Sequence, residues 1–269
     1  MTAMSVGKRS VALLNDNTLL ELLHDTATVV RGALDNVTDW GLAGTRRGQH
    51  LSDIAADEAA LAHLRAANVG IMSEESGPHD ADKDIVVVVD PLDGSTNALH
   101  GVPWFATSLC AVDRDGPRAA VVVNQASGTR FEAVRGGGAR RDGIPIVPSA
   151  TEHLAEAIVG LTGYPSRHLG WRQFRAMGAA ALDIAAVAAG VMDAYIDCTV
   201  GLHGPWDYLG GLLICREAGA HVVDGSGDEL VTLDWTARRM PIAASTKALL
   251  DEVVAARLSS NSDTPGKNG

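Results

Sequence analysis

The stretch Ile85-Val-Val-Val-Val-Asp-Pro-Leu-Asp-Gly-Ser-Thr-Asn97 carries the clearest structural signal in the chain. Residues 85–89 form a continuous β-branched run, which predicts a strand buried on both faces. A polar segment, residues 90–97, follows the run directly. In this segment Gly94 can adopt backbone conformations that strain other residues. Ser95 can cap a helix whose free N–H groups hold phosphate oxygens. The sequence therefore predicts chemistry at the end of a buried strand, and a purely structural turn is the alternative.

The sequence on either side of this segment predicts further helices and strands. Upstream, helices are expected from Thr18, whose spacing to Glu21 fits a capping box, and from Ser52 or Asp53. Downstream, runs at 108–112, 119–123 and 129–134 are separated by turn residues and predict an antiparallel meander. In the second half, helices are expected at 178–189 and 206–218, strands at 194–197, 220–223 and 241–244, and a helix at the end. This alternation is typical of an α/β architecture.

Composition and charge exclude several classes of protein. In a chain of 269 residues, 46% hydrophobic and 20% charged residues are typical of a soluble globular protein. A net charge of -11 opposes general binding to nucleic acid or to an anionic membrane, because both require a basic surface. Three cysteines without metal-type spacing indicate neither a disulfide framework nor a zinc site and favour a reducing compartment. We therefore expect a cytoplasmic protein that binds neither nucleic acid nor membrane.

Three acidic clusters lie far apart in the sequence. They are Glu74 with Glu75, Asp90 with Asp93, and Asp207. Carboxylates that folding brings together repel each other, so such a site needs a compensating cation, and oxygen ligands suit Mg²⁺. Two ions that share a carboxylate would polarise a phosphate, lower the pKa of a bound water and shield the departing alkoxide. Taken alone, the two glutamates are typical of a solvated surface pair.

Residues 90–97, preceded by Glu-Glu and followed late by Trp206-Asp207, resemble the inositol monophosphatase family. The resemblance extends from about Asp57 to about Ala244 and includes the Gly136-Gly-Gly138 turn. It implies an α/β (α+β) fold, a layered αβαβα sandwich of the inositol monophosphatase/fructose bisphosphatase type. Residues 1–147 would form an N-terminal half with most metal ligands, 148–258 a C-terminal half that closes the substrate pocket, and 259–269 a flexible tail.

The resemblance also implies roles for individual residues. The catalytic residues would be Glu74, Ser95 and Asp57, with Asp57 supporting the Ser95 hydroxyl. Two or three Mg²⁺ ions would bind to Glu74, Asp90, the carbonyl of Leu92, Asp93 and Asp207. The phosphate would contact Asp93, Gly94 and Ser95, and the alcohol would contact Gly178, Ala180 and Asp197. The nucleophile would be a metal-bound water.

The chain departs from the family pattern at three places. Ser95 stands where many members carry Thr, which keeps the hydroxyl but loses the methyl group that restricts χ1. Arg46 would take the cationic role of the lysine that the family usually carries, with an ordinary surface arginine as the alternative. The loop 198–206 is closer to relatives that also accept fructose bisphosphate. His203 in this loop is either at the pocket rim or an ordinary loop histidine.

The function implied is a Mg²⁺-dependent phosphomonoesterase that hydrolyses a small sugar or polyol phosphate, inositol monophosphate first, through a metal-activated water. Fructose 1,6-bisphosphate and histidinol phosphate are the alternatives. A 3′(2′),5′-bisphosphate nucleotide fits less well, because Ser95-Thr96-Asn97 lacks the charged pair of that branch. A catalytically idle, metal-binding regulatory relative is the alternative of a different class. The resemblance also suggests a homodimer.

Overall fold

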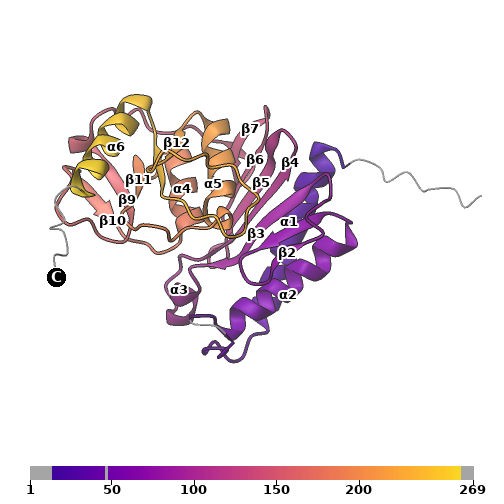
Figure 1. Ribbon diagram of the computed structural model, residues 1–269. Coiled ribbons are helices and arrows are strands. Elements are labelled where there is room, and N and C mark those ends of the chain that lie inside the picture. The colour runs from indigo at the N-terminus through magenta and orange to yellow at the C-terminus, as the bar shows by residue number, and fades with distance from the viewer. Residues whose placement is uncertain (1–13, 46–47, 262–269) are drawn as a thin grey trace, which may run out of the picture.

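The computed structural model describes residues 14–45 and 48–261. Its elements form five layers in the order αβαβα (Figure 1). Two long helices cover one face of an eight-stranded sheet, and two further helices lie between this sheet and a five-stranded sheet. A last helix covers the outer face of the five-stranded sheet. The layered sandwich predicted from the sequence is confirmed.

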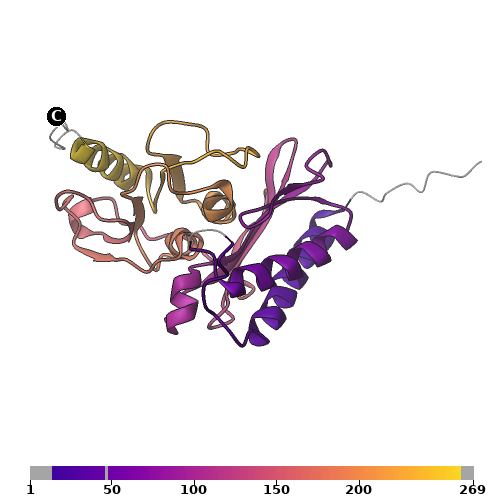
Figure 2. The ribbon, with the colours of Figure 1, turned by 60° about the horizontal axis from the view of Figure 1, so that its bottom comes forward.

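Helices α1 (Asp16–Asp35) and α2 (Leu51–Ala66) form the first layer and lie side by side (Figure 2). Both begin before the residues that the sequence indicated. Thr18 is not the cap of α1, because Asn15 is the N-cap and its side chain accepts a hydrogen bond from the Thr18 amide at 3.0 Å. The N-cap of α2 is His50. The apolar faces of both helices pack against the large sheet.

The eight-stranded sheet has the order β2-β1-β3-β4-β5-β6-β7-β8. Strand β1 pairs in parallel with β3, and the other neighbours are antiparallel. The strands are β1 (Gly70–Ser73), β2 (Gly77–His79), β3 (Val86–Asp93), β4 (Ala106–Asp113), β5 (Gly116–Asn124), β6 (Arg130–Val134), β7 (Gly138–Arg141) and β8 (Ile144–Pro145). The predicted meander is confirmed as β4, β5 and β6. The sequence missed β1, β2, β7 and β8, which are too short to show a pattern.

Strand β3 is buried along its whole length, as the β-branched run predicted. Val87 and Val89 pack toward the first helix layer. Val86 and Val88 pack toward the helices between the two sheets. The strand that precedes the polar segment therefore lies at the centre of the molecule, and its carboxyl end is fixed on both faces.

The middle layer consists of α4 (Ala180–Ala188) and α5 (Pro205–Ala218). The five-stranded sheet has the order β10-β9-β11-β13-β12, and α6 (Lys247–Asn261) covers its outer face. Its strands are β9 (Ile158–Thr162), β10 (Gln173–Arg175), β11 (Ala194–Asp197), β12 (His221–Asp224) and β13 (Pro241–Ala244). Two short helices, α3 (Ser95–His100) and η1 (Leu154–Glu156), lie in connections. All three strands predicted for this half are confirmed, whereas β9 and β10 were missed.

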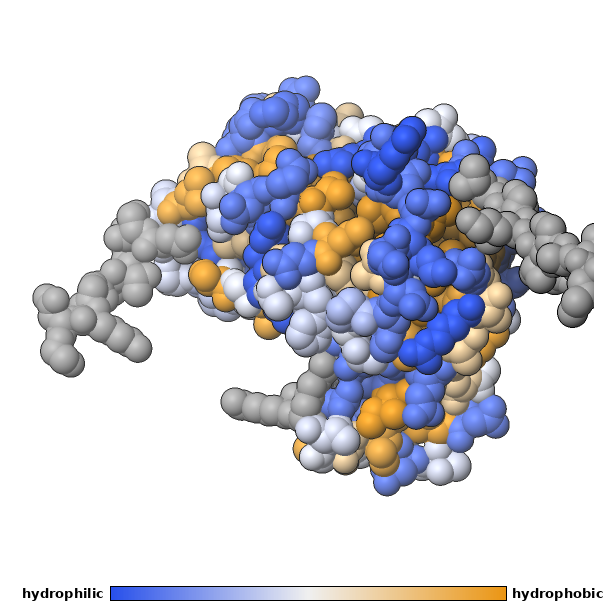
Figure 3. All heavy atoms as spheres, turned by 45° about the vertical axis from the view of Figure 1, so that its right-hand side comes forward, coloured by the Kyte–Doolittle hydropathy of each residue, from blue (hydrophilic) through white to orange (hydrophobic). Residues whose placement is uncertain are grey.

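Helix α6 continues to Asn261, so the first residues of the tail expected at 259–269 are helical. The division into halves at 147/148 falls in the connection between β8 and η1, and it stays a prediction. No helix in the described part of the chain is long and apolar enough to cross a membrane. On the face shown in Figure 3, hydrophilic side chains are interspersed with smaller apolar patches.

Candidate active site

Glu74 follows the carboxyl end of β1, and Asp90 lies in the carboxyl-terminal half of the neighbouring strand β3. Strands β1 and β3 run parallel, with Ser73 paired to Val89, so the residues that follow lie at the same edge of the sheet. The Glu74 amide donates a hydrogen bond to the Val89 carbonyl at 3.1 Å. Asp90 is buried, and its Oδ1 accepts a hydrogen bond from the amide of Leu92 at 3.0 Å. The missed strand β1 is thus what brings the first two acidic clusters together.

A bulge in β3 brings Asp93 to the same side of the sheet as Asp90. Residues three apart in a regular strand point to opposite faces. Here Asp90 pairs with Ser108 of β4 and Asp93 pairs with Ala106, so β3 contains one residue more than β4 over this interval. Pro91, which has no amide hydrogen for the ladder, lies inside the bulge. The spacing Asp-Pro-Leu-Asp therefore gives two carboxylates that face the middle helix layer.

The N-termini of α4 and α5 contribute the remaining contacts. Asp207 is the third residue of α5, and its Oδ2 accepts a hydrogen bond from the Gly204 amide at 2.6 Å. Asp93 reaches across to α4, where its Oδ2 accepts a hydrogen bond from the Ala181 amide at 2.8 Å. The positive ends of the two helix dipoles favour negative charge here. Both halves of the chain therefore meet at one cluster of carboxylates.

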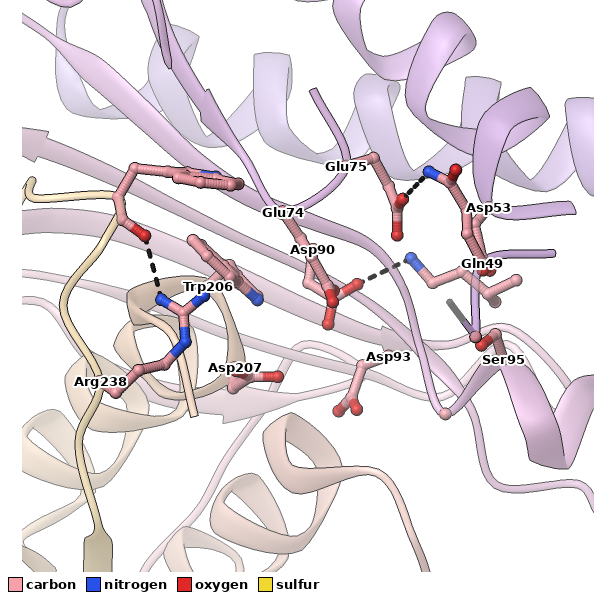
Figure 4. A pocket seen from close by; sticks show the side chains of 14 residues that line it. Gln49, Asp53, Glu74, Glu75, Asp90, Asp93, Ser95, Trp206, Asp207 and Arg238 are labelled. Carbon is pink, nitrogen blue, oxygen red and sulfur yellow. Dashed lines mark hydrogen bonds between the residues drawn. The ribbon is translucent and has the colours of Figure 1, made fainter. Parts of the chain in front are cut away.

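Glu74, Asp90, Asp93 and Asp207 surround one space, with Ser95 and Asp53 on one side of it (Figure 4). One carboxylate oxygen from each of Glu74, Asp90 and Asp207 lies within 4.8 Å of the others. Asp93 and Leu92 line the same cavity of about 410 Å³ without belonging to that triad. All five residues that the sequence assigned to metal binding thus line a single cavity.

Burial and mutual repulsion disfavour the charged forms of these carboxylates. Burial, and then the charges of Glu74 and Asp93, raise the pKa of Asp90 well above its ordinary value. Burial and the charge of Asp207 raise the pKa of Asp93 to about 7, against hydrogen bonds from α4 amides. Burial also raises the pKa of Asp207. A divalent cation would remove this repulsion. A set of ligands that consists of oxygen atoms alone fits Mg²⁺.

Asp53 lies beside Ser95 in the structure, and Asp57 does not. Asp53 lines the same cavity as Ser95 and lies beside it (Figure 4), and burial raises its pKa against the effect of the nearby Ser95 hydroxyl. Asp57 lies one helical turn further along α2 and accepts a hydrogen bond from the buried Ser73 hydroxyl. Asp53 therefore occupies the position that the sequence assigned to Asp57. Aspartates four residues apart share one helix face, and the sequence alone did not determine which of them reaches α3.

A second cavity, of about 290 Å³, adjoins the first and shares Glu74, Asp93 and Asp207 with it. Gly178 and Ala180, which the sequence assigned to substrate binding, line this cavity. Both lie at the start of α4, beside the residue that holds Asp93. The second cavity therefore contains two of the three residues that the sequence assigned to the alcohol part of a substrate.

Asp197, also assigned to substrate binding, does not line either cavity. It is fully buried, where it accepts hydrogen bonds from Nδ1 of His203 at 2.7 Å and from the Thr199 hydroxyl at 2.6 Å. His203 lines the second cavity instead. Burial opposes the charged form of His203, but the hydrogen bond to Asp197 and the charge of Asp207 raise its pKa overall. Asp197 therefore positions His203, and His203 is the residue at the pocket.

Several residues that the sequence did not assign to the site also line the cavities. Gln49 donates a hydrogen bond to Glu75 at the edge of the first cavity. Trp235 donates from Nε1 to the Ser73 carbonyl at 2.8 Å, which ties the connection between β12 and β13 to β1. The residues missed are Gly48, Gln49, Asp53, Thr162, Leu202, Trp206, Trp235 and Arg238. Apart from Trp206, which the sequence analysis named only as the neighbour of Asp207, none belongs to a local motif that marks it, and Arg46 lies outside the described residues.

Comparison with known proteins finds relatives of this chain in sequence and in fold. The model of the inositol monophosphatase family matches residues 49–262. The fructose-1,6-bisphosphatase of Pyrococcus furiosus is 31% identical over 211 residues, 76% of this chain and 81% of that protein. The fructose-1,6-bisphosphatase/inositol-1-monophosphatase of Methanocaldococcus jannaschii is 32% identical over 210 residues, 75% and 82% of the two chains. The solved structure of the Thermotoga maritima IMPase has a TM-score of 0.76 at 26% identity and covers 92% of this chain and 98% of its own.

Proposed function

Because the chain belongs to the inositol monophosphatase family and is a phosphoric monoester hydrolase, we propose that it is a Mg²⁺-dependent phosphatase of inositol monophosphate. Substrates of this family are small phosphorylated sugars or polyols. Fructose 1,6-bisphosphate and histidinol phosphate are the alternative substrates. The observation that carries the proposal is the triad of the buried Asp90 and the half-buried Glu74 and Asp207, whose oxygens lie within 4.8 Å of one another.

Two or three Mg²⁺ ions would be held by the carboxylates of Glu74, Asp90, Asp93 and Asp207 and by the carbonyl of Leu92. When bound, the ions would polarise the phosphate, lower the pKa of the attacking water and stabilise the leaving alkoxide. The donor chemistry fits, because all donors are oxygens and the raised pKa values of Asp90 and Asp93 reflect a charge that protein groups leave uncompensated.

The phosphate would lie against the turn from β3 into α3. Gly94 has φ of 82°, and a Cβ at this position would lie 3.0 Å from the Gly178 carbonyl oxygen, so the backbone can pack here only without a side chain. We propose that Asp93, with the amides of Gly94 and Ser95, contacts the phosphate. These contacts would fix the phosphorus atom for attack from one side.

Glu74 and the Ser95 hydroxyl would orient the attacking water, and Glu74 would accept its proton. Asp53, which lies beside Ser95, would hold its hydroxyl in place, which is the role that the sequence gave to Asp57. The alcohol would lie in the second cavity, against Gly178, Ala180 and His203. A phosphomonoester would thus be split directly into inorganic phosphate and an alcohol, without a phosphoenzyme.

A panel assay tests the proposal. Phosphate release is measured from inositol 1-phosphate, fructose 1,6-bisphosphate, histidinol phosphate and 3′-phosphoadenosine 5′-phosphate, each with Mg²⁺ and with EDTA. We expect Mg²⁺-dependent release, fastest from inositol 1-phosphate, and none from the Asp93→Asn variant. If Mg²⁺ binds but no substrate is hydrolysed, the phosphatase hypothesis is wrong, and the chain is a catalytically idle regulatory relative. A faster reaction with another substrate of the panel would leave the proposed mechanism unchanged and would identify that compound as the preferred substrate.

A further inference from the structure

Arg238 lies between the two cavities and lines both of them. It belongs to the connection between β12 and β13, far in sequence from the acidic clusters. Figure 4 shows Arg238 with Trp206 on one side of the carboxylates and Ser95 on the opposite side. A substrate whose phosphate lies at Ser95 would therefore extend across the carboxylates toward Arg238.

The guanidinium of Arg238 is held in a fixed orientation. Its Nη1 donates hydrogen bonds to the carbonyls of Trp235 at 3.0 Å and Ala237 at 2.8 Å. Its Cζ lies 5.1 Å from the centroid of the Trp206 ring, in a cation–π contact with a buried side chain. Within the described residues, Nε and Nη2 donate to no protein atom. Three N–H groups are thus oriented in advance for a planar, bidentate contact.

The charges of the second cavity favour an anion near Arg238. Its acidic walls, Glu74, Asp93 and Asp207, are the carboxylates that the metal ions would neutralise. His203 is already paired with the buried Asp197. Among the described residues that line the second cavity, Arg238 therefore contributes a positive charge that is hydrogen-bonded to carbonyls and to no carboxylate, although it lies close enough to Asp207 to lower the pKa of that residue.

We propose that Arg238 binds a second phosphate on the alcohol part of the substrate, an inference that rests on the proposed function. A sugar bisphosphate is then a better substrate than the sugar monophosphate that shares its reacting phosphate, because the guanidinium forms charge-assisted hydrogen bonds with the remote phosphate. An alcohol that carries an ammonium group, such as histidinol, is disfavoured by the same charge. Arg238 thus determines specificity and takes no part in the chemical step.

Two other roles for Arg238, support of Trp206 and a charge effect on Asp207, would not depend on a second phosphate. The side chain could merely support Trp206, and its charge also lowers the pKa of Asp207. Both of these effects act on every substrate alike. A ratio of activities toward two substrates that differ only in the remote phosphate separates recognition from support, since uniform losses cancel in the ratio.

The matched substrates are fructose 1,6-bisphosphate and fructose 1-phosphate, which share the phosphate at C1. We would measure kcat/KM for both at saturating Mg²⁺ with the wild type, Arg238→Met, Arg238→Lys and Arg239→Met. Arg239 is the matched control, because it is the adjacent arginine but its Nε donates to the Glu229 carbonyl and it lines neither cavity.

We expect the wild type to prefer the bisphosphate and Arg238→Met to reduce the ratio of the two kcat/KM values by about ten- to a hundredfold. Arg238→Lys should keep part of the preference, because it keeps the charge without the planar fork. Arg239→Met should leave the ratio unchanged.

Equal losses on both substrates in Arg238→Met would overturn the inference and leave the phosphatase intact. An unchanged ratio would have the same meaning. If the wild type released no phosphate from either sugar or from inositol 1-phosphate in the presence of Mg²⁺, the proposed function would fail, and the inference would fail with it.

Discussion

Ser95 and Asp53 lie side by side at one side of the first cavity, so we expect the two side chains to act as one unit. We predict that Ser95→Ala and Asp53→Ala each lower kcat by about a hundredfold, because each leaves the attacking water poorly oriented. The double variant should lose no more than the worse single variant. Steady-state kinetics of the three variants test this prediction. If the loss of kcat in the double variant equalled the product of the two single losses, the two residues would act independently.

Asp57 has a structural role, because its carboxylate accepts a hydrogen bond from the buried Ser73 hydroxyl. We predict that Asp57→Ala lowers the free energy of unfolding by about 1–3 kcal/mol, since it leaves a buried hydroxyl without its partner. Urea unfolding measures the loss, and kcat should stay close to that of the wild type. A large loss of kcat at unchanged stability would return Asp57 to the catalytic role that the sequence gave it.

Sequence reasoning was least reliable at this scale. It singled out Glu74, Asp90, Asp93 and Asp207 through the resemblance of their motifs to the family, and the structure brings these four carboxylates to one cavity. It did not identify Asp53 or Arg238, because an aspartate in a helix and an arginine in a connection have no local signal of their own. Which of two aspartates on one helix face reaches Ser95 depends on how α2 packs against the sheet, and this is a tertiary property.

The central element is β3, with the turn that joins it to α3. Its buried strand could be predicted from the valine run, but the bulge that turns Asp90 and Asp93 to one face could not, because it is defined by the pairing with β4. The short strand β1 was missed for the same reason. Only its place beside β3 identifies Gly70–Ser73 as a strand.

A substitution at Gly94 tests whether the conformation of this turn is needed for activity. Ala at position 94 must adopt φ of 82°, and its Cβ would lie 3.0 Å from the Gly178 carbonyl oxygen and 3.2 Å from the Ala179 Cβ. We predict that Gly94→Ala lowers the free energy of unfolding by at least about 1–2 kcal/mol and abolishes phosphate release, because the strained turn moves away from α4.

The matched control is Gly101→Ala at the other end of α3. Gly101 has φ of 69°, and no atom lies within 4 Å of a Cβ built there. This variant should have a similar cost in unfolding free energy but retain its activity. Loss of activity in both variants, measured by denaturant unfolding and phosphate release, would show that α3 as a whole and not the Gly94 turn matters.

At the scale of the whole molecule, the site joins both halves of the chain. Glu74, Asp90 and Asp93 come from the eight-stranded sheet, and Asp207 comes from α5 of the middle layer. The five layers and their order followed from the sequence through the family resemblance, because the motifs span most of the chain. The geometry of the pocket between the layers did not follow, since it depends on loops such as 198–204.

Because buried carboxylates from both halves repel each other, Mg²⁺ should stabilise the fold. We predict that Mg²⁺ at a hundred times its Kd adds about 2.7 kcal/mol to the free energy of unfolding and raises the midpoint of thermal unfolding. A sodium salt of equal ionic strength should not have this effect, and Asp207→Asn should reduce it strongly. An equal response to both salts would show that the carboxylates do not form a metal site.

The central claim is that these carboxylates hold Mg²⁺ for the hydrolysis of a phosphomonoester. The most direct measurement is phosphate release from inositol 1-phosphate as a function of Mg²⁺ concentration, for the wild type and for Asp90→Asn, each after removal of metal by EDTA. We predict no release from the metal-free wild type, saturable recovery on addition of Mg²⁺, and no recovery for Asp90→Asn. Release that persists in EDTA, or equal recovery in both proteins, would contradict the claim.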